Sequence, residues 1–233
     1  MTTAFLSDIH GNFEALSAVL ADIDRRQVSN IGCAGDIVGY YPQINECCAA
    51  LQDRQAVCVM GNHDWYMTSG GFCARSRSVN DCLHFQRRII SPTSLTWLAS
   101  HPVQAWLDGV HIVHGGWSDP INEYLQPSAE YFSQVIGSVF LSGHTHHPMI
   151  RRYGDKLYCN PGSVGQPRDG DPRASFAIYQ DGEFEICRVP YDPQPIYALM
   201  EAAGFNDYYY GGLATGAQRL TRLRQTPTDT DRG

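Results

Sequence analysis

Five short motifs of aspartate, asparagine and histidine recur along the chain, and each follows an apolar run that is typical of a β-strand. They are Asp8-Ile9-His10, Gly35-Asp36, Gly61-Asn62-His63-Asp64, His114-Gly115-Gly116 and Gly143-His144-Thr145-His146. Each motif has a glycine within one or two residues, which permits a tight turn away from the sheet. In open α/β sheets the carboxyl ends of neighbouring strands, about 4.8 Å apart, gather ligand-binding side chains at one edge. We therefore expect the five motifs to surround one or two metal ions.

The types of donor atom indicate which metals these are. Imidazole nitrogens and carboxylate oxygens without thiolates suit Mn, Fe, Zn or Ni rather than a cysteine-based structural zinc site. An aspartate in the middle of such a set can bridge two cations through its two oxygens. Two cations about 3.5–4 Å apart clamp a phosphoryl group and lower the pKa of a water between them. The sequence therefore predicts two divalent metal ions, with Mn favoured and Fe, Zn or Ni as alternatives.

Taken singly, the motifs are less specific than the set. A lone Asp-x-His is usually a turn or a helix cap, and a lone Gly-Asn-His-Asp indicates no more than a turn. Gly-His-Thr-His is a stronger signal, because an extended segment would place His144 and His146 on the same side of the chain. The ordered set of five at strand ends is what favours a metal site over a purely structural role.

With these five motifs, which span most of the chain, the sequence resembles the calcineurin-like metallophosphoesterase superfamily. Residues 35–40 and 160–168 are similar to its small bacterial-type branch of phosphatases and phosphodiesterases, some of whose members cleave dinucleoside polyphosphates. The protein Ser/Thr phosphatases of the superfamily carry an Asp-Arg pair where this chain has Gly39 and Tyr40. This departure weighs against phosphoprotein hydrolysis.

The resemblance implies an α/β fold, an α-β-β-α sandwich of two packed β-sheets flanked by helices, with two metal ions at the edge of the sheets. Carried over motif by motif, the implied ligands are Asp8, His10 and His146 for the first ion, Asn62, His114 and His144 for the second, and Asp36 as the bridge. The resemblance implies that His63 does not bind metal but acts on the substrate. It would serve as general acid to the leaving oxygen or as a hydrogen-bond donor to phosphate.

Three further candidates each have a structural alternative. Asp64 is a catalytic candidate that would orient His63, or it caps the turn that follows. Asn12 would contact the phosphate of the substrate, or cap the helix that follows it. Arg168 would bind a second phosphate together with Arg173, or both belong to a solvated turn with the aspartates beside them.

Short apolar strands that alternate with helical stretches predict an α/β protein. We expect strands at 4–6, 30–34 and 56–60 and helices at 13–25, 43–51, 78–90 and 196–203, with a further helix starting at 91–93. Asp-Gly pairs between apolar runs predict hairpins at 108–109 and 181–182. Because no repeat or linker divides the chain, we expect one domain over residues 1–225 and a disordered tail at 226–233.

Composition limits the partners. A net charge of −7 gives no basic footprint for duplex nucleic acid, although bound cations can attract a small anionic substrate. No window approaches the ~18 apolar residues that span a membrane. None of the eight cysteines forms a Cys-x-x-Cys pair, which indicates reduced thiols and a cytoplasmic protein. The sequence carries no signal for an oligomeric state.

These observations predict a metal-dependent phosphoesterase that acts on a small phosphorylated substrate, a phosphodiester or a dinucleoside polyphosphate, through a metal-activated water. One alternative is a phosphomonoesterase that acts on phosphoproteins or nucleotides. Another is a metal-binding scaffold without catalysis. Since all seven implied ligands and His63 are present, the scaffold is the weakest of the three.

Overall fold

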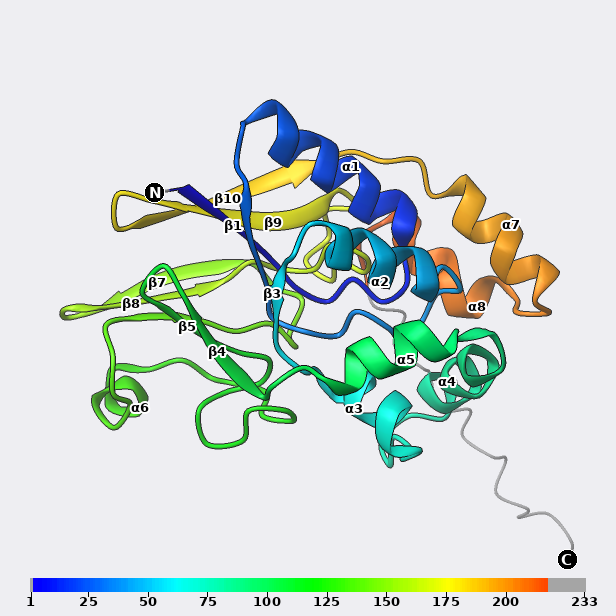
Figure 1. The fold of residues 1–233 in the computed structure, drawn as a ribbon, viewed down its shortest axis with the longest axis horizontal. Helices are drawn as coiled ribbons and strands as arrows, with labels where there is room; N and C mark the ends of the chain where they lie inside the picture. Colours follow the sequence, from blue (N-terminus) through cyan, green and yellow to red (C-terminus); the bar gives the residue numbers. More distant parts are fainter. Residues whose placement is uncertain (1, 218–233) are drawn as a thin grey trace, which may run out of the picture.

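The computed structural model describes residues 2–217 as two five-stranded β-sheets packed face to face (Figure 1). The first sheet has the order β10-β9-β1-β2-β3, with β1 (Thr2–Leu6), β2 (Asn30–Cys33), β3 (Val57–Cys58), β9 (Ala174–Gln180) and β10 (Glu183–Val189). The second has the order β4-β5-β6-β8-β7, with β4 (Gln104–Leu107), β5 (Val110–Val113), β6 (Val139–Leu141), β7 (Met149–Tyr153) and β8 (Lys156–Asn160).

Both sheets have parallel strands at the centre and an antiparallel hairpin at an edge. Strands β1, β2 and β3 are parallel, as are β5, β6 and β8. The hairpins β4–β5 and β9–β10 turn at the two predicted Asp-Gly pairs. Asp108 and Gly109 have φ of 49° and 81°, the left-handed conformation that two-residue hairpin turns require.

Strand residues alternate between two cores. In β1, Phe5 packs between the sheets, whereas Ala4 and Leu6 pack against the helices outside. The core between the sheets consists of Phe5, Ala34, Val59, Val110, Ile112, Leu141, Leu157, Cys159, Ala177 and Phe184. The central strands are apolar almost throughout because they are buried on both faces. Since neighbouring central strands are parallel, their carboxyl ends lie together within each sheet.

Helices cover the outside of both sheets, which confirms the predicted α-β-β-α sandwich. They are α1 (Phe13–Arg25), α2 (Ile44–Asp53), α3 (Asn62–Ser69), α4 (Arg77–Ile89), α5 (Pro92–Ala99), α6 (Ala129–Ser133), α7 (Gln194–Ala202) and α8 (Asp207–Tyr210), followed by a 3₁₀ turn at Gly211–Ala214. Helices α1 and α2 lie over the first sheet, and α6 lies beside the second (Figure 1). None of the helices in the described part of the chain is both long and apolar enough to cross a membrane.

The element predictions hold except around β3. That strand has two residues instead of the expected five, because the Met60 N–H leaves the sheet and donates to the carbonyl of Pro102. The motif that begins at Gly61 is then the start of α3 rather than a turn. The expected domain end at residue 225 and the tail 226–233 lie outside the described residues.

Candidate metal centre

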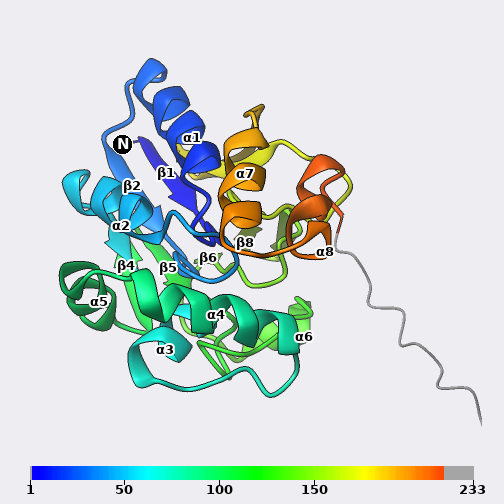
Figure 2. The same ribbon diagram turned by 90° about the vertical axis from the view of Figure 1, so that its right-hand side faces the viewer.

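The five motifs meet at the carboxyl ends of five strands, at the end of the sandwich that faces the viewer in Figure 2. Asp8 follows β1, Asp36 follows β2, and Asn62 opens α3 just beyond β3. From the second sheet, His114 comes directly after β5 and His144 comes three residues after β6. All five side chains are almost completely buried, so the two sheets bring them into one shared, water-poor site.

The backbone of this site is strained. Nine non-glycine residues in the described chain have a positive φ, and five of them are predicted ligands: Asp8 (54°), His10 (55°), Asp36 (54°), His144 (66°) and His146 (60°). A left-handed residue costs about 1–2 kcal/mol, and such residues cluster where the surrounding structure and a function demand them. The expectation of an extended Gly-His-Thr-His segment is wrong, because both histidines take this left-handed conformation.

Asp8, His10 and His146 form the first cluster of donor atoms. The Nε2 atoms of the two histidines lie 3.1 Å apart, while each Nδ1 donates to a backbone carbonyl, that of Val38 or Gln166. Two neutral imidazoles therefore point lone pairs at each other. Asp8 Oδ1 lies 3.2 Å from His146 Nε2 and is buried without a hydrogen-bond partner.

Asp36, His114 and His144 form the second cluster, and Asn62 joins it through its amide oxygen. His114 Nε2 lies 3.0 Å from His144 Nδ1, 3.1 Å from Asn62 Oδ1 and 3.3 Å from Asp36 Oδ2. His114 Nδ1 donates to the carbonyl of Ala34, so Nε2 is the ring atom that faces the cluster. A carbonyl that orients the ring in this way is the usual outer partner of a metal-binding histidine.

Asp36 stands between the two clusters. Its Oδ2, which faces His114, also lies 3.8 Å from His10 Nε2, and its Oδ1 accepts the backbone N–H of His63. Burial by itself raises the pKa of this carboxyl, but the nearby His114 and His63 outweigh it and hold the pKa well below its usual range. Asp36 is therefore an ionised carboxylate with one oxygen directed at both clusters.

Most of these side chains are in the protonation state that a metal ligand requires. Burial lowers the pKa of His144 to about 3 and keeps its imidazole neutral, as a metal ligand must be. His114 differs, because the Asp36 carboxylate overcomes the effect of burial and raises the pKa of His114 to about 10. A proton and a cation thus compete for the Asp36–His114 pair. The facing imidazoles and orphaned carboxylate oxygen of the first cluster fit a divalent cation. The imidazole, carboxylate and amide donors of the second cluster, also without a thiolate, suit the same kind of cation once His114 loses its proton.

His63 lies beside the first cluster, next to His10. Its ring centroid is 4.8 Å from that of His10, the residue is 6% exposed, and burial lowers its pKa to about 4. A third cluster includes His63, but it shares His10 and Asp36 with the other two. The ring lies against Gly39, where a Cβ atom would come within 2.7 Å of His63 Nδ1 and 2.5 Å of His10 Nδ1. Only glycine leaves room for both rings.

Asn12 takes its structural alternative, whereas Asp64 bonds to segments that precede it rather than capping the turn that follows. Asp64 accepts hydrogen bonds from the backbone N–H groups of Ile37, Val38 and Gly61, so it joins the Asp36 turn to the start of α3. None of its hydrogen bonds reaches the His63 ring. Asn12 caps α1 by accepting the N–H of Ala15, and its amide group donates to Gly165 O and the Tyr191 hydroxyl.

The predicted arginines separate into two environments. Arg173 pairs with Asp171 in an exposed turn, as the solvated alternative described, although Asp169 pairs with Arg188 rather than with either of them. Arg168 points toward the centre instead. It donates to the Tyr40 hydroxyl at 3.1 Å and to Gln166, and the Tyr40 ring lies 4.8 Å from that of His10.

Gln86 is a positioning residue that the sequence analysis missed. This fully buried side chain of α4 accepts the N–H of Gly39 at 3.0 Å and donates to the carbonyl of Tyr41 at 2.6 Å. Gln86 thereby holds in place the turn at Gly39, which lies against the rings of His10 and His63. The signal was present in the sequence, since Gln86 falls in the apolar stripe of α4 formed by Val79, Cys82 and Leu83.

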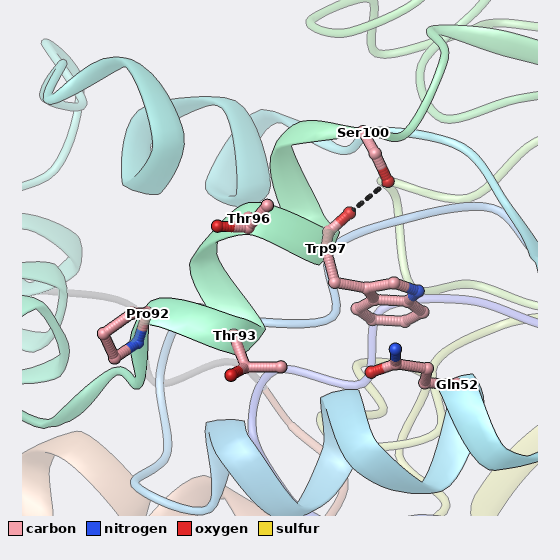
Figure 3. Close-up of a pocket in the computed structure, with 6 residues that line it drawn as sticks. All are labelled: Gln52, Pro92, Thr93, Thr96, Trp97 and Ser100. Atoms are coloured by element: carbon pink, nitrogen blue, oxygen red, sulfur yellow. Dashed lines mark hydrogen bonds between the residues drawn. The ribbon is translucent and has the colours of Figure 1, made fainter.

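A hollow of about 490 Å³ lies elsewhere on the surface, between α2 and α5 (Figure 3). Its lining residues are Gln52, Pro92, Thr93, Thr96, Trp97 and Ser100. None of these is titratable or a member of either cluster. The hollow is therefore separate from the candidate metal centre.

Comparison with known proteins agrees with this geometry. The sequence model of the calcineurin-like phosphoesterase superfamily domain matches residues 1–181, which contain all five motifs. The chain is a calcineurin-like phosphoesterase. It is accordingly a metal-dependent phosphoric ester hydrolase, and the resemblance inferred from the motifs is confirmed.

Relatives of this phosphoesterase come from archaea and bacteria. An uncharacterized protein of Methanocaldococcus jannaschii is 35% identical over 227 residues, which covers 83% of this chain and 89% of that protein. The crystal structure of a metallophosphoesterase from Sphaerobacter thermophilus is 31% identical, with a TM-score of 0.83 over 93% of this chain and 100% of that one. A hypothetical protein of Pyrococcus horikoshii shares the fold at 18% identity, with a TM-score of 0.82 over 93% and 99% of the two chains.

Proposed function

We propose that this phosphoesterase holds two divalent cations, Mn²⁺ in the first place, and hydrolyses a phosphodiester or a dinucleoside polyphosphate. The observation that carries the proposal is the pair of donor clusters joined by Asp36. Asp8, His10 and His146 would hold one ion, Asn62, His114 and His144 would hold the other, and Asp36 would bridge them. Fe, Zn or Ni would suit the same donors.

When bound, two such cations polarise the phosphoryl oxygens and lower the pKa of a water toward neutrality. The protein supplies position and hydrogen bonding. His63 is neutral in its buried setting, and its Nε2 faces the centre, 4.0 Å from Asp36 Oδ2. It would donate a hydrogen bond to a phosphoryl oxygen or to the leaving oxygen. Gly39 and Gln86 hold the turn against which the ring rests.

Tyr40 favours a small substrate over a phosphoprotein. It occupies the position of the arginine in protein Ser/Thr phosphatases, and its ring lies 5.1 Å from His63 and 4.8 Å from His10. The phosphate-binding cation then has to come from elsewhere, and Arg168, bonded to the Tyr40 hydroxyl, is the side chain in place.

The test is hydrolysis of bis(p-nitrophenyl) phosphate by metal-stripped protein, before and after Mn²⁺ is added. We expect turnover only with metal. His63→Ala should lose about 10²–10⁴-fold in kcat while two metal ions per chain remain by elemental analysis. Asp36→Asn should lose both turnover and metal. The exposed His84 provides a matched control, and His84→Ala should behave as wild type.

Absence of turnover with every divalent metal, despite two bound ions, would refute the diesterase proposal. Hydrolysis of p-nitrophenyl phosphate would then identify a monoesterase, and its absence would identify a scaffold.

A further inference from the structure

Tyr124 brings an arginine to the rim of the metal centre. Tyr124 belongs to the segment between β5 and α6 and is 49% exposed. The centroid of its ring is 4.0 Å from that of His144. Arg75, from the segment between α3 and α4, lies over the same ring with its Cζ 5.0 Å from the centroid. A guanidinium over an aromatic face is held by a cation–π interaction, so Tyr124 fixes the cation beside a predicted metal ligand.

Arg75 has no carboxylate partner among the described residues. Within residues 2–217 it forms no salt bridge, whereas Arg173 and Arg188 are both paired with aspartates. What distinguishes Arg75 from other unpaired arginines of the described chain is its place over the Tyr124 ring, which lies against His144. Its planar fork of donors remains available to an anion, and phosphate suits that fork.

Arg168 has the corresponding place at the other cluster. It is bonded to Tyr40, which lies against His10, and it too forms no salt bridge in the described chain. Each cluster of donors therefore has one arginine beyond it, fixed by a tyrosine: Arg168 by Tyr40 and Arg75 by Tyr124. A substrate with a single phosphoryl group would leave at least one of these cations without a partner.

We propose that Arg75, positioned by Tyr124, forms an anion subsite that binds a phosphoryl group adjoining the one that is cleaved. The substrate is then a chain of phosphoryl groups, such as the bridge of a dinucleoside polyphosphate, rather than an isolated phosphodiester. This inference rests on the proposed function, because it names the substrate class of the same site.

Binding separates this inference from catalysis. The probe is diadenosine tetraphosphate with methylene groups in place of the bridging oxygens, titrated calorimetrically in saturating Mn²⁺, with AMP as the single-phosphoryl comparison. Arg75→Gln should weaken binding of the tetraphosphate about tenfold and leave AMP unchanged, as expected for a lost charged hydrogen bond. Tyr124→Leu should behave like Arg75→Gln, and Tyr124→Phe should restore wild-type binding because the ring is kept.

Arg77→Gln is the matched control, since it removes an equal charge from the first residue of α4. The subsite is overturned if wild-type protein does not bind the tetraphosphate, if Arg75→Gln binds it as wild type does, or if Arg77→Gln weakens it equally. It is also overturned if Arg75→Gln weakens AMP as much as the tetraphosphate. Failure of the proposed function appears separately, as absent hydrolysis of bis(p-nitrophenyl) phosphate.

Discussion

Replacement of Gln86 by methionine should destabilise the protein and the turn behind its active site. The side chain is fully buried, and it bonds the Gly39 N–H and the Tyr41 carbonyl. Methionine has a similar length and volume but offers neither partner, so two buried backbone groups lose their hydrogen bonds. Each unsatisfied group costs about 1–3 kcal/mol, and the free energy of unfolding should therefore fall by about 2–6 kcal/mol.

The same substitution should reduce activity, because Gly39 backs both His10 and His63. We expect kcat for bis(p-nitrophenyl) phosphate to fall about tenfold to a hundredfold, as small displacements of catalytic groups do. Urea unfolding and steady-state kinetics measure the two effects. Gln52→Met, at an exposed position of α2, is the control and should stay within about 0.5 kcal/mol of wild type. If the free energy of unfolding of Gln86→Met falls by less than about 1 kcal/mol and kcat is unchanged, then Gln86 does not hold this turn in place.

Three further predictions follow from the site and its surroundings. Gly39→Ala should abolish hydrolysis of bis(p-nitrophenyl) phosphate, because its Cβ would meet both His10 and His63; near-normal kcat would show that the turn can move aside. Chelation of the metals should lower the thermal unfolding midpoint, since ligand at a hundredfold over its Kd stabilises by about 2.7 kcal/mol; calorimetry with an unchanged midpoint would contradict the two-cation proposal. Burial lowers the pKa of His101 from 6.5 to about 4. The unfolded state therefore binds more protons below pH 6.5, and the free energy of unfolding of metal-stripped protein should fall as pH drops toward 4. Urea unfolding of His101→Gln should lack this part of the decline, and an identical slope would contradict it.

Local sequence signals predicted the elements with clear periodicity or punctuation. Helix α1 spans the predicted residues because its apolar stripe, with the Asn12 cap, defines both its face and its start. The Asp-Gly hairpins form where expected because their turn demands left-handed residues. Strand β3 was overestimated, since the length of a short edge strand depends on the partner that its N–H groups find, here the carbonyl of Pro102.

The candidate site likewise has features that the sequence predicts and features that it does not. The residue types and their order along the chain were sufficient to name the family and a metal-dependent hydrolase, because the five motifs resemble those of the family. Periodicity could not show which alternative role Asp64 takes. That depends on the backbone N–H groups of Ile37 and Val38, which are 27 and 26 residues away in the chain.

By itself, the sequence determined the α/β class, the five motifs and the kind of metal that their donors suit, because these follow from residue chemistry and local period. Only the tertiary structure decided that Gln86 supports the turn behind His63. It also placed Arg75 over Tyr124. These contacts join segments distant in the chain, and their partners are selected by strand order and packing rather than by any pattern within one segment.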